Sequence, residues 1–257
     1  IIRWFDHYLK GIENGEDKKP KATYYVNGEN QWHTSEDWMP KEARLVNLYL
    51  DSDGHANSMN GDGRVTLTPA ETGSDAYVYD PEFPCGGEGD GFDDGWVSPY
   101  KCNSRQIRSD VLVYDTPVLE QDIAIAGPLY AELYAASSAV DTDFIVRVSD
   151  VDEQGTARNV SFNIIRAEFR KGWDKPELLT PGKIEKYEME MYFYGMVFKK
   201  GHKIRIDISS SELMEAFPNT NTGIDPYTDP KPIKATQTIY HGREYPSHVK
   251  LPVLYGL

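Results

Sequence analysis

The chain contains no G-x-S-x-G sequence, the turn on which α/β-hydrolases carry their nucleophilic serine. None of its serines lies between an apolar strand and a following helix. A serine nucleophile also needs a base within hydrogen-bond reach, and no such arrangement is visible. The sequence therefore predicts that these 257 residues contain no catalytic residue.

Metal-binding patterns are missing as well. The six histidines form no H-x-H or H-E-x-x-H pair, and Cys85 and Cys102 form no C-x-x-C pair. We therefore predict neither a metal site nor a cofactor. The two cysteines form either one disulfide or two separate thiols, and the sequence leaves both open.

Long apolar runs and an excess of basic residues are also lacking. No stretch approaches the ~20 apolar residues that cross a bilayer. Lys and Arg total 27 against 41 Asp and Glu, a net charge of −14, which disfavours nucleic-acid and anionic membrane surfaces. We expect neither a nucleic-acid nor a membrane partner. The compartment stays undetermined, with the cytoplasm favoured over export.

What the sequence does contain, from residue 22 onward, is alternation of apolar and polar residues with period two. Gly, Pro, Asn and Asp separate these runs, and no segment of helical period lies between them. The pattern predicts an all-β, antiparallel jelly-roll sandwich. Arg205 and Asp207 are expected to face outward. The residues expected on inward faces include Val46, Leu48 and Leu50; Tyr187, Met189, Met191 and Phe193; and Ile204, Ile206 and Ile208.

Residues 1–12 differ from the rest because they have helical period. Ile1, Phe5 and Leu9 belong to an apolar stripe of the kind that packs against another element. Gly11 is a natural C-cap, and a polar linker follows. We predict one amphipathic helix before the first strand.

Several histidines suggest catalysis, but a structural role is favoured for each. His7 follows Asp6 on the polar side of the helix and is expected to face solvent or another domain. His202 lies in a Gly-containing turn. His241 and His248 flank a Tyr-Pro-Ser turn, where hydrogen bonding to nearby groups is the simpler role.

Acidic loops raise the question of Ca²⁺. The segment DSDGH (51–55) begins like a calcium loop, but its fifth position is His, and Asp62 stands where Glu is usual. EGDGFDDG (88–95) could hold a hard cation, although an ordinary solvated loop is favoured. Asp141 and Asp143 are expected to cap local backbone N–H groups.

Four tryptophans lie in expected loops: Trp32, Trp38, Trp96 and Trp173. Sugars stack on exposed aromatic rings, so a carbohydrate-binding jelly-roll module is the alternative function. Tryptophan also fills domain interfaces.

Several stretches together resemble one family. The stretches are RWFDHYLKG, YVNGENQW, LYLDSDGHANSMNGDG, YDPEFPCGG, RSDVLVYDTPVLEQDIAIAGP, YAASSAVDTDFIVRVSDVDEQG, FKKGHKIRIDISSS, FPNTNTG and QTIYHGREYPSHVKLPVL. Their order and spacing are similar to the C-terminal portion of CocE/NonD serine hydrolases, which include X-Pro dipeptidyl-peptidases, cocaine esterase and α-amino acid ester hydrolases.

The resemblance implies a division of the chain. Residues 22–257 would form a galactose-binding-like jelly roll, and residues 1–21 would be the final helix and linker of a missing α/β-hydrolase domain. In the family the Ser, Asp and His of the triad belong to that domain. By this resemblance no triad residue lies here, and nothing is carried over onto His7.

The resemblance also implies a function. The family hydrolyses esters or amides by acyl transfer through a Ser-His-Asp triad. This chain would be the non-catalytic C-terminal β domain, supporting the catalytic domain, the substrate pocket or an oligomer interface. The upstream α/β-hydrolase domain is then the expected partner. In its absence the exposed helix stripe predicts a homodimer.

Overall fold

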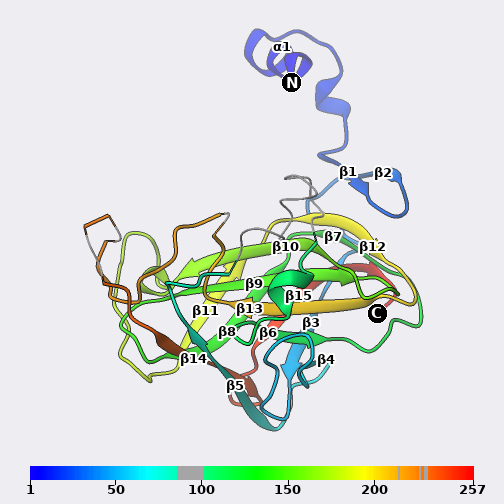
Figure 1. Cartoon of the computed structure of the whole chain (residues 1–257). Coiled ribbons are helices and arrows are strands. Elements are labelled where there is room, and N and C mark those ends of the chain that lie inside the picture. The colour runs from blue at the N-terminus through cyan, green and yellow to red at the C-terminus, as the bar shows by residue number, and fades with distance from the viewer. Residues whose placement is uncertain (86–100, 214, 226, 229–230) are drawn as a thin grey trace.

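The computed structural model describes residues 1–85, 101–213, 215–225, 227–228 and 231–257 (Figure 1). Helices are few and short among these residues, and none is long and apolar enough to cross a bilayer. The helical elements are α1 (Ile2–Lys10), η1 (Glu16–Lys18), α2 (Asn103–Gln106) and η2 (Ala167–Phe169).

Strands make up most of the ordered structure. They are β1 (Ala22–Val26), β2 (Gln31–Ser35), β3 (Arg44–Asp51), β4 (Arg64–Thr66), β5 (Thr72–Tyr79), β6 (Leu112–Asp115), β7 (Ile123–Gly127), β8 (Tyr130–Ser137), β9 (Asp143–Val151), β10 (Ala157–Arg166), β11 (Glu185–Glu190), β12 (Tyr194–Phe198), β13 (Lys203–Ser209), β14 (Ala235–Gly242) and β15 (His248–Tyr255).

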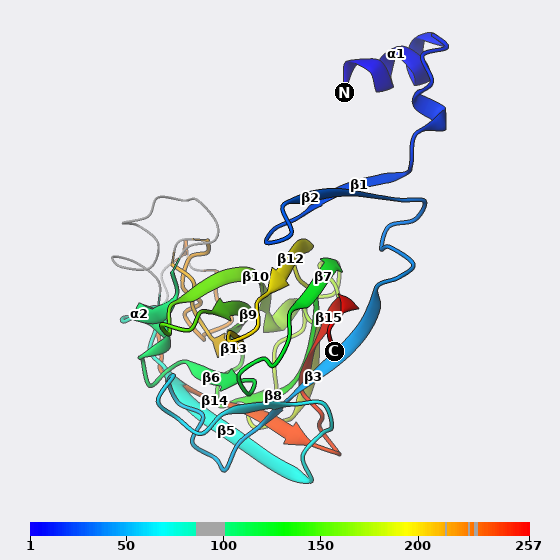
Figure 2. The same cartoon turned by 90° about the vertical axis from the view of Figure 1, so that its right-hand side faces the viewer.

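Apart from β1 and β2, which form a separate two-stranded sheet, the strands are arranged as two facing layers. Their hydrogen-bonded order is β10-β9-β13-β6-β4-β3-β15-β8-β14-β5, with β11 on β8 and the β7–β12 pair on β15. Pairings between these strands are antiparallel except for one parallel contact between β4 and β6. The order bends near β4, so that β9 and β13 lie across from β5 and β14 (Figures 1 and 2). The prediction of an antiparallel all-β sandwich after one helix is confirmed.

One apolar core joins the two layers. Phe144 of β9 meets Tyr187 of β11 with 4.9 Å between ring centroids. The Tyr77 hydroxyl of β5 lies 2.8 Å from the Ser210 hydroxyl at the end of β13. Ile206, like its neighbours two residues away on β13, is fully buried in this core. The alternation of apolar and polar residues in the sequence therefore corresponds to one face of each strand being buried in the core.

One expectation about strand faces is wrong, and a second holds for the face but not for its exposure. Phe193 does not continue the buried face of Tyr187 and Met189, because β11 ends at Glu190 and the chain leaves the sheet; its side chain is 66% exposed. Arg205 and Asp207 do point away from the core on β13, but they are buried. The short helix α2, which the sequence pattern does not predict, covers them.

The helix α1 stands clear of the sandwich. The chain runs from α1 through η1 to the β1–β2 hairpin, which lies between α1 and the two layers (Figure 2). Arg3 and Asn14 exchange two side-chain-to-carbonyl hydrogen bonds of 2.6 and 2.7 Å, so α1 packs against its own linker. Gly11 closes the helix with φ 67°, as the sequence predicts.

A buried ionic cluster lies beneath α2. The carboxylate of Glu212 accepts hydrogen bonds from Arg105 of α2 and from Arg147 of β9. Arg147 also donates to Asn159 of β10 at 2.7 Å, and its guanidinium lies 4.6 Å above the ring of Phe162. The cluster thereby connects α2, two strands and the segment after β13.

Asp207 and its neighbours extend the same cluster. Gln106 donates to Asp207 at 2.8 Å and accepts from Arg205 at 2.9 Å, and Arg205 donates to Asp115 of β6. Burial raises the pKa of Asp207. Burial also opposes ionisation of Glu212, but its two guanidinium partners outweigh this and lower the pKa of Glu212.

We expect Glu212→Gln to destabilise the domain, because it leaves two buried guanidinium groups without their shared carboxylate. Removing one partner of a buried ion pair costs about 3–5 kcal/mol. Urea unfolding at pH 7 measures the loss. Glu215→Gln, an exposed change of the same kind close by, should stay within about 0.5 kcal/mol of the parent. A loss of less than about 1 kcal/mol in Glu212→Gln would show that the cluster does not hold the sandwich together.

Candidate functional site

An uncovered apolar stripe runs along α1. No residue of α1 is buried, although the helix is strongly amphipathic. Its large apolar side chains are between 45% and 97% exposed: Ile1, Ile2, Trp4, Phe5, Tyr8, Leu9 and, just beyond the helix, Ile12. An apolar face of this kind normally packs against another element or another protein.

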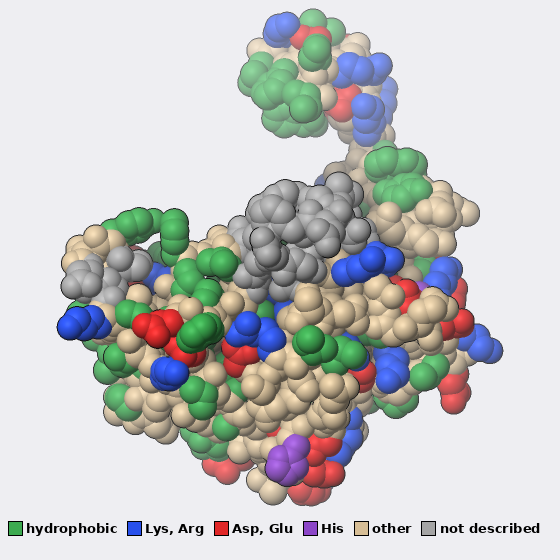
Figure 3. Space-filling view, viewed as in Figure 1, with side chains coloured by type: hydrophobic (Ala, Val, Ile, Leu, Met, Phe, Trp, Pro, Cys, Tyr) green, Lys and Arg blue, Asp and Glu red, His purple; other side chains and the backbone are tan. Residues whose placement is uncertain are grey.

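An aromatic groove lies between the β1–β2 hairpin and the start of β12, on the sandwich side of the linker that leads from α1. Its volume is about 640 Å³. Trp38 forms edge-on contacts with Tyr24 and Phe193, with 5.8 Å between ring centroids in both pairs. Trp32 packs against Tyr25, also lines the groove and is 71% exposed. Figure 3 shows hydrophobic side chains gathered on α1 and on the hairpin beneath it.

The hairpin is firmly attached to the sandwich by its inner strand. Asn27 exchanges backbone hydrogen bonds of 2.9 Å with Gly195 and Val197 of β12. Gly195 is required here, since a Cβ at this position would lie 2.5 Å from the carbonyl oxygen of Tyr25. Val26 is completely buried against Val197. The groove is therefore a preformed surface.

Polar contacts fix the tip of the hairpin. The Tyr255 hydroxyl of β15 donates to Glu29 at 2.6 Å, and His33 lies 2.7 Å from the other carboxylate oxygen. These hydrogen bonds, that of Tyr255 first, lower the pKa of Glu29. The exposed aromatic rings are thus held by strands at both ends of the chain.

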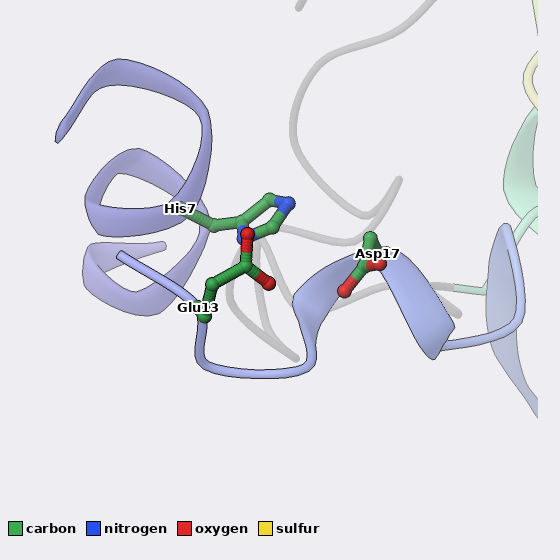
Figure 4. A group of neighbouring side chains, drawn as sticks. All are labelled: His7, Glu13 and Asp17. Atoms are coloured by element: carbon green, nitrogen blue, oxygen red, sulfur yellow. The ribbon is translucent and has the colours of Figure 1, made fainter. Parts of the chain in front are cut away.

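One histidine and two acidic side chains lie close together on α1 and its linker. One ligand-type atom each of His7, Glu13 and Asp17 lie within 4.8 Å of one another (Figure 4). The His7 Nδ1 atom already lies 3.1 Å from the carbonyl of Ile12. Both carboxylates are exposed, and such groups are common on surfaces without an ion. We assign no metal to this group.

A serine, a histidine and an aspartate meet inside the sandwich, an arrangement that the sequence does not reveal. Ser52 donates to Asp75 at 2.7 Å, and His241 Nε2 lies 3.1 Å from both of them. The Tyr114 hydroxyl adds a hydrogen bond of 2.8 Å to the same Asp75 oxygen. Ser52 and Asp75 are separated by 23 residues, and His241 lies 166 residues further on.

This cluster lacks the geometry of a catalytic triad. In a triad, one ring nitrogen of the histidine faces the serine and the other faces the carboxylate. Here Ser52 and Asp75 share one ring nitrogen of His241, and its Nδ1 atom has no hydrogen-bond partner among the described residues. All three side chains are buried, so a substrate has no access. The cluster is structural, as the sequence predicts for His241.

The remaining histidines also make structural contacts. His202 Nδ1 lies 2.9 Å from Asp150 and links the start of β13 to β9. His248 Nδ1 lies 2.6 Å from the carbonyl of Pro246, and burial lowers the pKa of His248. The preference for structural roles at both positions is confirmed.

The cysteines and the first acidic loop are also settled. Cys85 and Cys102 are buried thiols in separate apolar clusters and form no disulfide with each other. Burial raises the pKa of Cys102. In the loop that begins like a calcium site, Asp51 and Asp53 both accept hydrogen bonds from Arg64. The second loop, EGDGFDDG, lies outside the described residues.

The three tryptophans of this set that the structure describes do not form one platform. Trp32 and Trp38 lie in the aromatic groove, whereas Trp173 packs against Phe169 beside η2. Trp96 lies outside the described residues.

Comparison with known proteins identifies the chain. Residues 14–250 match the family model of the X-Pro dipeptidyl-peptidase C-terminal non-catalytic domain. The chain belongs to this family.

Similar proteins in the family are hydrolases of greater length. The chain is 32% identical to cocaine esterase from Rhodococcus sp. (strain MB1 Bresler), over 98% of this chain and 45% of that protein. An aminopeptidase from a marine sediment Thaumarchaeota archaeon superimposes with TM-score 0.79 at 25% identity, and an α-amino acid ester hydrolase with TM-score 0.78 at 26% identity. Each match covers 98% of this chain but only 43% and 44%, respectively, of the chains in those two structures. It thus corresponds to the non-catalytic C-terminal domain of CocE/NonD-type hydrolases and spans less than half the length of these relatives.

The family domain also carries an acidic cluster at the β9–β10 end of the sandwich. Asp141 accepts from the backbone N–H of Glu168 at 2.9 Å and from Asn219 at 2.7 Å. Asp141 therefore caps a backbone N–H group, but one 27 residues away instead of a local one. Asp143 forms no such cap among the described residues and pairs with Arg166 at 3.0 Å.

The environment of Asp141 favours its neutral form. Burial raises the pKa of Asp141 to about 6, the nearby charge of Asp143 adds to this, and the hydrogen bond from Asn219 opposes it. The side chain lies at the wall of a cavity of about 400 Å³. Its folded pKa is above that of the unfolded chain, so this group contributes stability at low pH that is lost as the pH rises through about 6.

We expect Asp141→Asn to remove this dependence. In the parent domain Asp141 should lower the unfolding free energy by up to ~1.4 kcal/mol per pH unit between about pH 4 and pH 6. Urea unfolding at several pH values, compared between parent and variant, isolates this group from carboxylates such as Glu212 that titrate in the opposite sense. Asp225→Asn, exposed at the same cavity, should leave the curve unchanged. Parallel curves for parent and Asp141→Asn would contradict the assignment.

Proposed function

We propose that residues 22–257 are a docking and supporting domain for an α/β-hydrolase domain that precedes them, and that residues 1–21 belong structurally to that partner. The observation that carries this proposal is the uncovered stripe of α1. The proposed hydrolase acts on esters or amides by acyl transfer, and this chain supplies none of its catalytic groups. Three features of the described residues support the assignment.

The first feature is the position of α1. It stands away from the sandwich and buries none of its own residues, yet its apolar side is as regular as that of a core helix. Burying an apolar side chain is worth about 1.5–3 kcal/mol, and the helix realises almost none of this within the described chain. A partner that covers the stripe would recover this free energy.

The second feature is the place of the aromatic groove along the chain. The aromatic groove lies where the chain passes from the linker into β1, and Lys21 lines it together with Trp38 and Phe193. A domain held by α1 would therefore also meet the groove. The third feature is the rigidity of that groove, since a preformed surface loses less entropy on docking.

The same groove argues against the carbohydrate-binding alternative. Ring stacking on a sugar needs accessible flat ring faces. Trp38 and Phe193 instead meet at 84°, edge to face, as rings do in packed protein interfaces. Of the described tryptophans Trp32, Trp38 and Trp173, only the first two lie together.

We expect the chain alone to show no turnover of p-nitrophenyl esters or X-Pro anilides, because its buried Ser52 cluster cannot act as a triad. Expressed in one polypeptide with an α/β-hydrolase domain encoded upstream of Ile1, it should be part of an active enzyme. Spectrophotometric assays measure both. Turnover by the chain alone that disappears in Ser52→Ala would overturn the proposal, and so would an upstream reading frame with no G-x-S-x-G.

We expect the chain alone to form homodimers through the stripe of α1. Light scattering at high concentration should give twice the 29.1 kDa of one chain. Leu9→Lys places a charge on the stripe, where Leu9 is 72% exposed, and should yield monomers. Asp6→Asn changes the net charge equally on the polar side and should remain dimeric. A monomeric parent, or a dimeric Leu9→Lys, would contradict this use of α1.

A further inference from the structure

A second apolar cavity opens at the end of the sandwich, between β3–β4 and the connection from β6 to β7. Its volume is about 780 Å³, within the range of small-molecule sites. Leu48, Ile123 and Ile204 form its floor and are almost completely buried in the core. The cavity therefore reaches between the two layers. It shares no lining residue with the aromatic groove. We call it the alkyl pocket.

The rim of the alkyl pocket is apolar but open to solvent. Leu67 is 57% exposed and Val118 is 54% exposed. The segment that carries Val118 is held in place by the turn before β13. Leu119 donates a backbone hydrogen bond of 2.8 Å to His202 and accepts one of 2.9 Å from Gly201. The pocket is thus preformed, and burial of its exposed apolar rim by a ligand would be energetically favourable.

The chemistry of the lining selects a ligand class. The apolar side chains that line the pocket are aliphatic, and its described lining residues include no aromatic ring, Lys or Arg. A flexible hydrocarbon chain fits such walls, whereas a planar ring finds no stacking partner and a carboxylate finds no cation. Glu120 is the one charged side chain among the described lining residues, and it has no ion-pair partner among the described residues. Its charge is available to a cationic group at the opening.

We propose that the alkyl pocket binds a small alkylammonium amphiphile, with the hydrocarbon chain on the floor of Leu48 and Ile204 and the cationic head beside Glu120. The net charge of −14 favours the same sign of ligand. This inference does not depend on the proposed docking function, because the two sites share no residues.

A homologous series tests the inference. Hexyl-, octyl- and decyltrimethylammonium are titrated into the chain by calorimetry below their micelle concentrations. Each added methylene should tighten binding about fourfold, which corresponds to ~0.8 kcal/mol, until the chain fills the pocket. Binding that does not depend on chain length would overturn the proposal.

Variants of the rim locate the binding. Val118→Lys places an ammonium at the opening and should weaken binding of the decyl compound at least tenfold. Val78→Lys is the matched control, because Val78 on β5 is also 54% exposed and does not line the pocket. Equal binding by Val118→Lys and the parent would mean uptake elsewhere, for example on α1, and would overturn the proposal. Both changes are at exposed side chains, and thermal unfolding verifies that both variants are folded.

The head group is tested separately. Glu120→Gln should weaken binding of the decyl compound by about two- to fivefold, the range of an exposed ion pair. Binding of neutral 1-octanol should be unchanged in the same variant. A loss of affinity for both ligands, or for neither, would contradict the role of Glu120. Tight binding of 1-octanol together with no effect on the ammonium compound would show that the pocket selects hydrocarbon without regard to charge.

Discussion

The carboxylate of Glu212, shared by the guanidinium groups of Arg105 and Arg147, is the interaction on which the described sandwich depends most. Charges buried this deeply are tolerated only when their partners are in place, because desolvation costs several kcal/mol for each ion. The three groups come from α2, β9 and the segment after β13, so all three must be positioned together. Asp207 and Arg205 are likewise buried charged groups that need their partners in place, and they lie on the same layer. A strand face that would otherwise be open to water is thereby sealed by a short helix.

The described chain therefore has a well-packed core but leaves part of its apolar surface uncovered. Inside, apolar residues from both layers meet in one core, and the carboxylate of Asp75 accepts hydrogen bonds from its buried neighbours Ser52 and Tyr114. On the surface, α1 and the aromatic groove present apolar area that no described part of the chain covers. Because the sandwich is fixed independently of these surfaces, it can act as a rigid body against which another domain is placed. Family membership and the greater length of the relatives agree with such a role.

The sequence predicts the features that depend on local pattern. Alternation predicts the buried Ile204, Ile206 and Ile208, and helical period predicts α1 with its cap at Gly11. It does not predict where a pattern stops, so Phe193 is wrongly placed inside. Nor does it show that Asp207 is buried, because the helix that covers this position comes from a segment about 100 residues earlier. The alkyl pocket leaves no local signal either, since its lining comes from separate strand ends and loops.

The cluster of Ser52, Asp75 and His241 shows why residue types alone do not establish catalysis. A serine nucleophile becomes reactive when one ring nitrogen of a histidine removes its proton, while a carboxylate on the other ring nitrogen orients the ring and stabilises the imidazolium that forms. In this cluster the Ser52 hydroxyl donates its hydrogen bond to the Asp75 carboxylate. The histidine contacts both Ser52 and Asp75 through the same ring nitrogen. Burial opposes ionisation of Asp75, yet the hydrogen bonds, that of His241 first, lower its pKa. The carboxylate is then the acceptor that holds β5, β6 and β14 together, and its full set of donors is what makes it inert.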